Sequence, residues 1–218
     1  MTNPSASDLM VAVIIGGHNF EVPEFTRLFR AMPGLDCYPQ TLENFAADLS
    51  GVREQYDALV FYNMHAEPPT AQAKAVLEAL GERPQGLVFL HHGLLAYRNW
   101  GLLNEILDLP DRSFKYSPGY SDNETIYVEI ADPNHPITQG LQPFTLVDET
   151  YGLAPAGPNS RILLTTHHPK SMPTLAWART YKNARVFALA LGHGKTAYQN
   201  PNFQTVLQRG IAWAAGKI

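Results

Sequence analysis

Four short runs of consecutive apolar residues mark the first half of the chain and its last quarter. Each run is too short for a typical helix and is followed directly by glycine, asparagine or histidine. Strands that are apolar at every position are buried on both faces, as in a parallel sheet covered by helices on both sides. We therefore expect four inner strands of one sheet, at Val11–Ile15, Ala58–Tyr62, Leu87–Leu90 and Val186–Leu191.

Segments with helical spacing of apolar residues lie between and after these runs. Alternating strands and helices are typical of a three-layer α/β fold, so we expect a flavodoxin-like fold with a mostly parallel central sheet. We treat residues 1–218 as a single domain. Five helices are predicted. The first begins at Val22, the second covers Leu42–Leu49, and the third runs from the capping residue Thr70 to about Leu80. The fourth includes Leu102–Leu107, and the fifth covers Pro201–Ala215.

The segment from Phe114 to about Thr180 has a different pattern. Short strand candidates are separated by proline, glycine, asparagine and aspartate, and no long helical pattern is present. We expect a β-rich excursion of hairpins and loops within the same domain. Its strand candidates are Thr125–Ile130, Phe144–Val147, Arg161–Thr166 and Thr174–Trp177.

Composition and charge narrow the range of partners. The 218 residues are 45% hydrophobic with a net charge of −4, which gives no general attraction to nucleic acid or to an anionic membrane. Met1 to Asp8 lacks the basic start of a signal peptide, and no apolar run is long enough to span a bilayer. Cys37 is the single cysteine, which excludes an internal disulfide and fits a reducing cytoplasmic setting.

Histidines follow the predicted inner strands. His18 comes shortly after the first run, His65 after the second, His91 and His92 after the third, and His193 after the fourth. In an open α/β sheet, ligands bind beyond the carboxyl ends of the strands. If these strands are parallel neighbours, five of the eight histidines converge on one edge of the sheet.

Several short motifs follow one another along nearly the whole chain. They are Gly16–Phe20, Gly86–Gly93, His135–Ile137, Asp148–Tyr151, Arg185–Phe187, Leu191–Gly194, Asn200–Phe203 and Gly210–Ala214. By the order and spacing of these motifs the chain resembles the ThuA-like trehalose-utilisation family, a branch of the class I glutamine amidotransferase-like superfamily. The resemblance implies a flavodoxin-like sheet and a role in the metabolism of sugars, including oxidised keto-sugars.

The sequence departs from true amidotransferases where their catalytic triad stands. His91 occupies the place of their nucleophilic cysteine, and Lys195 stands where a glutamate would follow the histidine that corresponds to His193. A thioester mechanism requires a thiolate at the first position, so glutamine hydrolysis is excluded. Neither the phosphate-loop pattern nor the dinucleotide fingerprint is complete, and no nucleotide cofactor is expected.

The strand-end groups favour acid–base or metal-assisted chemistry on a small sugar or keto-sugar. Imidazoles titrate near neutral pH, and two or three of them with a carboxylate also form a common divalent-metal site. We predict His91, Glu149 and His193 as catalytic residues, and a divalent metal (zinc or similar) on His18, His91 and His193. The resemblance also points to Glu149. The predicted substrate-binding residues are Asn19, Asn63, His65, His92, Tyr97 and Trp100.

Two other functions remain open from the sequence. The same fold could serve as a non-catalytic carbohydrate-binding or sensing module, or as a structural subunit with a vestigial cleft. The density of ionisable groups favours an enzyme over simple binding. A homodimer is expected because symmetric pairs are the commonest oligomers of such proteins.

Overall fold

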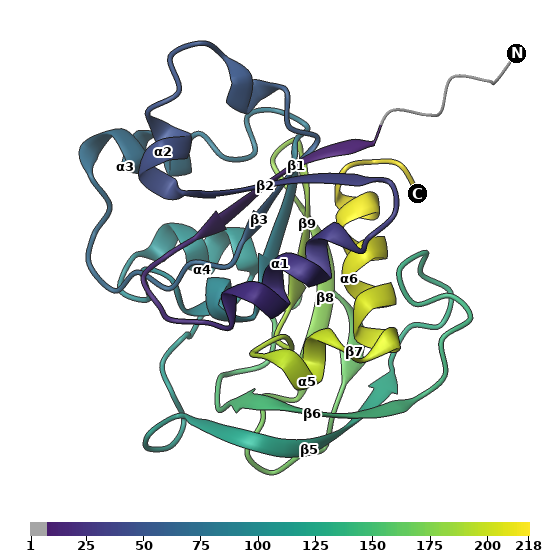
Figure 1. Ribbon diagram of the computed structural model, residues 1–218. Coiled ribbons are helices and arrows are strands. Elements are labelled where there is room, and N and C mark those ends of the chain that lie inside the picture. The colour runs from purple at the N-terminus through teal and green to yellow at the C-terminus, as the bar shows by residue number, and fades with distance from the viewer. Residues whose placement is uncertain (1–7) are drawn as a thin grey trace, which may run out of the picture.

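A computed structural model describes residues 8–218, so the expectation for the N-terminal signal lies almost wholly outside the described residues. Within this range nine strands form one sheet in the order β2-β1-β3-β4-β9-β8-β7-β5-β6 (Figure 1). The strands are β1 (Leu9–Ile15), β2 (Leu35–Thr41), β3 (Ala58–Phe61), β4 (Gly86–Leu90), β5 (Tyr120–Ile130), β6 (Phe144–Tyr151), β7 (Arg161–Thr165), β8 (Thr174–Tyr181) and β9 (Ala184–Leu189).

The first five strands in this order are parallel, and four of them are the predicted apolar runs. Strand β1 pairs with β2 and β3, β3 pairs with β4, and β4 pairs with β9, all in parallel register. Every residue of β3 and β4 is buried, because helices cover both faces of this half of the sheet. The edge strand β2 is only partly buried, so its residues do not form a continuous apolar run.

The prediction of a mostly parallel sheet is only partly correct. Strands β9, β8, β7, β5 and β6 pair in antiparallel register, so the second half of the sheet is antiparallel. Strand β8 runs on to Tyr181, which pairs with Ala184 across the two-residue turn at Lys182. A two-residue turn can join only antiparallel strands, and Lys182 has the positive φ of 50° that such a turn requires.

The helices lie close to their expected positions, although several are shorter. Thr70 caps α3 by accepting from the backbone N–H of Ala73, and Asn200 caps α6 in the same way. In Figure 1, α1 and α6 lie in front of the sheet and α4 lies behind it. No helix among residues 8–218 has the length and apolar character needed to cross a membrane. The helices are α1 (Val22–Arg30), α2 (Leu42–Ala46), α3 (Ala71–Glu78), α4 (Gly101–Leu107), α5 (Lys195–Tyr198) and α6 (Pro201–Ala214).

The β5–β6 pair crosses the molecule below the parallel strands (Figure 1). The predicted strand at Phe144–Val147 continues through Asp148 to Tyr151, so Glu149 lies inside β6 and not in a loop after it. This crossing brings a segment from the β-rich excursion beneath the carboxyl ends of β4 and β9. The excursion is therefore part of the site as well as of the sheet.

A tight helical turn follows β4 and packs directly on β3. The residues His91–Leu95 form a 3₁₀ turn in which every residue is buried. A Cβ atom on Gly93 would lie 2.2 Å from the backbone oxygen of Phe61, so only glycine allows this approach. The position of the two histidines thus depends on a backbone contact between neighbouring strand ends.

Replacing Gly93 with alanine should lower the free energy of unfolding by about 1–3 kcal/mol, the usual cost of overpacking a close contact. Gly101→Ala is the matched control, because no atom lies within 4 Å of its added Cβ. Urea denaturation followed by circular dichroism measures both. Equal stability of the two variants would contradict the close packing of the turn on β3.

Candidate functional site

His91 lies at the centre of the strand-end cluster. It is fully buried, and its φ of 43° places it in the left-handed region that residues other than glycine adopt uncommonly. Its Nδ1 lies 2.6 Å from the backbone oxygen of Ala190, which can only accept, so Nδ1 carries a proton. The opposite ring atom, Nε2, is left facing Tyr151 Oη at 2.7 Å and Glu149 Oε2 at 3.0 Å.

Glu149 is a nearly buried carboxylate between two imidazoles. Its side chain is 7% exposed, and Oε2 lies 3.0 Å from His91 Nε2 and 3.2 Å from His193 Nδ1. Burial opposes its ionisation, but the contacts with the two imidazoles outweigh burial and hold the pKa of Glu149 well below its usual range. Glu149 is therefore ionised at neutral pH, next to groups that can carry the compensating proton.

Asp148 holds the backbone that presents His193. This buried carboxylate accepts hydrogen bonds from the backbone N–H groups of Gly192 at 2.6 Å and His193 at 3.0 Å. Gly192 has a φ of 116°, a conformation that favours glycine, so the chain turns sharply after β9. The ring of His193 remains 38% exposed, and the neighbouring Glu149 carboxylate raises its pKa.

His92 is buried without any polar partner for its ring. It is 1% exposed, and neither Nδ1 nor Nε2 has a hydrogen bond. Its ring lies 4.7 Å from the ring of Tyr62 and 4.2 Å from that of His18, measured between centroids. Burial, followed by the neighbouring histidines, lowers its pKa, so the ring is neutral.

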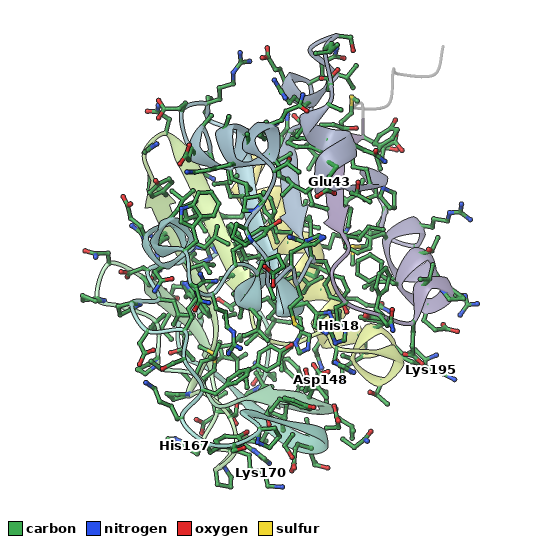
Figure 2. The ribbon with its side chains drawn as sticks, turned by 90° about the vertical axis from the view of Figure 1, so that its left-hand side faces the viewer. His18, Glu43, Asp148, His167, Lys170 and Lys195 are labelled. Carbon is green, nitrogen blue, oxygen red and sulfur yellow. The ribbon has the colours of Figure 1, made fainter. Side chains whose placement is uncertain are left out.

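A cavity of about 470 Å³ opens onto this cluster. His18, His92, Glu149 and His193 line it together with Tyr151, whereas His91 lies behind Glu149 and does not. Figure 2 shows His18 and Asp148 near each other at the end of the parallel strands, with His167 and Lys170 farther down at the lower end of the molecule. The cavity size suits a small organic ligand.

The other predicted binding residues lie around the cavity without lining it. Asn63 is buried and contacts the ring of His65 at 3.2 Å, and His65 stacks on Tyr97. Tyr97 and Trp100 line a separate hollow of about 240 Å³, so the predicted sugar-stacking wall is not part of the main cavity. Asn19 is exposed on the surface.

Several residues that line the cavity escaped the sequence analysis, among them Arg98, Asp122 and Tyr151. Arg98 and Asp122 are exposed at the cavity, and Tyr151 contacts both its interior and His91. Partial burial and the neighbouring Glu149 raise the pKa of Asp122. Tyr151 stands in the Asp148–Tyr151 motif and could have been inferred from it. Asp122 and Arg98 carry no sequence signal, because only the crossing of β5 and the turn before α4 bring them to the cavity.

Comparison with known proteins identifies the family of this chain. The ThuA family, described as trehalose utilisation, matches residues 41–214. The chain belongs to the ThuA family. A search of curated proteins found no match to this chain.

Solved structures share the fold of this ThuA protein at low sequence identity. A protein described as ThuA-like from Parabacteroides merdae is 24% identical with a TM-score of 0.75, and the match covers 97% of this chain and 91% of that one. A cytoplasmic protein from Salmonella typhimurium is 13% identical with a TM-score of 0.64, over 94% and 99% of the chains. A glutamine amidotransferase from Thermotoga maritima is 9% identical with a TM-score of 0.55, over 96% and 99%.

Removing the Asp148 carboxylate should destabilise the turn that carries His193. The Asp148→Ala variant leaves two backbone N–H groups without their acceptor, and we expect a loss of about 1–3 kcal/mol in the free energy of unfolding. Asp36→Ala, on the exposed edge strand β2, is the control. Thermal and urea denaturation measure the difference, and an unchanged Asp148→Ala stability would show that these hydrogen bonds do not hold the turn.

Proposed function

We propose that this ThuA protein is an enzyme that acts on a small sugar or keto-sugar by acid–base or metal-assisted chemistry. The observation that carries the proposal is the ionised Glu149 carboxylate, which lines the cavity in contact with the imidazoles of His91 and His193. The pKa of Glu149 is lowered and that of His193 is raised, and such a pair of groups in one cavity suits proton transfer better than simple binding.

The cavity has the polarity expected for a carbohydrate. Arg98, Asp122 and Tyr120 add donors and acceptors to those of Glu149 and His193, and Phe114 adds an aromatic surface beneath Arg98. Sugar hydroxyls require this mixture, because each buried hydroxyl needs a hydrogen-bond partner. The family description, trehalose utilisation, supports the same substrate class.

The positions of the groups suggest their roles. Glu149 reaches the cavity and is ionised, so it can accept a proton from a sugar hydroxyl or from a carbon next to a carbonyl. His193 is half-exposed and has a raised pKa, so it can donate one. His91 is a positioning residue in this scheme, because it contacts Glu149 and Tyr151 from behind the cavity wall.

Glutamine hydrolysis is not compatible with this site. The residue with positive φ after β4 is His91, not a cysteine. Cys37 lies on the edge strand β2, which β1, β3 and β4 separate from β9. Burial, followed by the nearby Asp36, raises the pKa of Cys37 to about 12, so its thiol is protonated and is a poor nucleophile. The amidotransferase fold therefore serves a different chemistry in this protein.

The Glu149→Gln variant should lose sugar turnover by about 100-fold or more, because removing a general base costs about 10²–10⁴ in rate. Trehalose and its keto form are the probes, and proton NMR follows the appearance of new sugar resonances. Saturation-transfer NMR on the same samples measures binding, which the variant should retain.

Glu43→Gln is the matched control, since Glu43 is exposed and lies apart from His18 and Asp148 in Figure 2. Native protein that binds a sugar without converting it would favour the non-catalytic binding module. If the native protein neither binds nor converts either probe, the carbohydrate proposal is wrong.

A further inference from the structure

Four residues of the cluster direct their ligand-type atoms toward one point. One ring nitrogen from each of His91, His92 and His193 and one carboxylate oxygen of Glu149 all lie within 4.8 Å of one another. They come from three separate parts of the chain: the turn after β4, the middle of β6 and the turn after β9. Three imidazoles and a carboxylate are a common ligand set for zinc and similar ions.

His92 is the clearest sign of a missing partner. A buried polar group without a hydrogen bond is costly, and buried histidines in proteins normally have one. Both ring nitrogens of His92 lack a partner, although the ring of Tyr62 lies only 4.7 Å away between centroids. The two ring nitrogens are therefore available to a metal ion, which imidazole coordinates through a nitrogen lone pair.

His91 is arranged as metal-binding histidines usually are. Its Nδ1–H donates to the backbone oxygen of Ala190, which fixes the tautomer and leaves Nε2 on the side of Tyr151 Oη and Glu149 Oε2. Metal-binding histidines commonly donate their other ring N–H to a backbone carbonyl in this way. His193 Nδ1 lies 3.2 Å from Glu149 Oε2 and makes no hydrogen bond, so this nitrogen is also available to a metal ion.

We propose that His91, His92, Glu149 and His193 bind one divalent transition-metal ion of the zinc type. The negative charge of Glu149 and the nitrogen donors of three imidazoles suit a divalent cation, and the adjoining cavity leaves room for a water or substrate oxygen as an additional ligand. His18, predicted as a ligand from the sequence, lies outside this set. It is exposed, its Nδ1 contacts its neighbour Asn19, and its ring centroid is 6.4 Å from that of His193.

This inference does not depend on the proposed sugar chemistry, because metal binding can be measured without a sugar. The experiment uses tag-free full-length protein treated with a chelator, then titrated with Zn²⁺ and with Co²⁺. Calorimetry should show one equivalent of Zn²⁺ per chain. Bound Co²⁺ should give the visible absorption typical of a site with a low coordination number.

The His193→Ala and Glu149→Gln variants should each weaken Zn²⁺ binding by more than about 100-fold, beyond the 10–100-fold that loss of a supporting residue costs. His193 is partly exposed, so its variant should fold normally, and circular dichroism checks this. His18→Ala should keep the native affinity. His167→Ala and Glu43→Gln are matched controls, because both residues are exposed and lie apart from His18 in Figure 2.

Two results would overturn the proposal. The first is native protein that binds neither ion with one-to-one stoichiometry. The second is stoichiometric binding that persists unchanged in folded His193→Ala and Glu149→Gln proteins. A loss of affinity in His18→Ala equal to that in His193→Ala would contradict the ligand set. Sugar turnover without metal binding would leave the proposed function standing and remove only the metal.

Discussion

The contact of the Glu149 carboxylate with His91 and His193 is the interaction on which the site depends. A nearly buried carboxylate is stable only with charged or strongly donating partners, and the two imidazoles at 3.0 and 3.2 Å provide them. These partners belong to turns at the ends of two adjacent parallel strands, β4 and β9. Strand β6 must therefore cross beneath those strand ends, and this crossing joins the antiparallel half of the sheet to the parallel half.

The turn after β4 shows how one backbone feature can support different chemistry. Its first residue, His91, has a positive φ, and Gly93 packs against the backbone of β3. In amidotransferases the corresponding elbow carries a cysteine that must be exposed to attack its substrate. His91 is instead fully buried, with its ring hydrogen-bonded to Ala190 and directed at Glu149. The fold is shared, but the side chain at the elbow is enclosed by its neighbours.

The cavity combines groups whose proton affinities are shifted in opposite directions. Contacts with imidazoles lower the pKa of Glu149, and the same carboxylate raises the pKa of His193. Partial burial, followed by the nearby Glu149, raises the pKa of Asp122. Burial keeps His92 neutral within the same cluster. Such separation within one small volume is typical of sites that move protons or bind a cation, and it arises from the differing burial of residues that are chemically alike.

The apolar runs determined β1, β3, β4 and β9 and the placement of histidines at their ends, because continuous hydrophobicity is a local signal for burial on both faces. The motif resemblance pointed to Glu149, which the structure places between His91 and His193. The sequence predicted hairpins in the excursion, but not that their strands extend the same sheet as an antiparallel half. These strands of mixed burial owe their pairing to the hairpin at Lys182 and to their neighbours.

The tertiary structure alone decided which histidines meet. Four of the five strand-end histidines, His18, His91, His92 and His193, cluster closely, whereas His65 stacks on Tyr97 away from the cavity. It also decided that His92, and not His18, joins the group around Glu149, and that Asp122 and Arg98 reach the same cavity. The sequence by itself determined which residues stand at the strand ends. The direction of each side chain depends on turn geometry and on strands that pair across long distances in the chain, which local patterns do not encode.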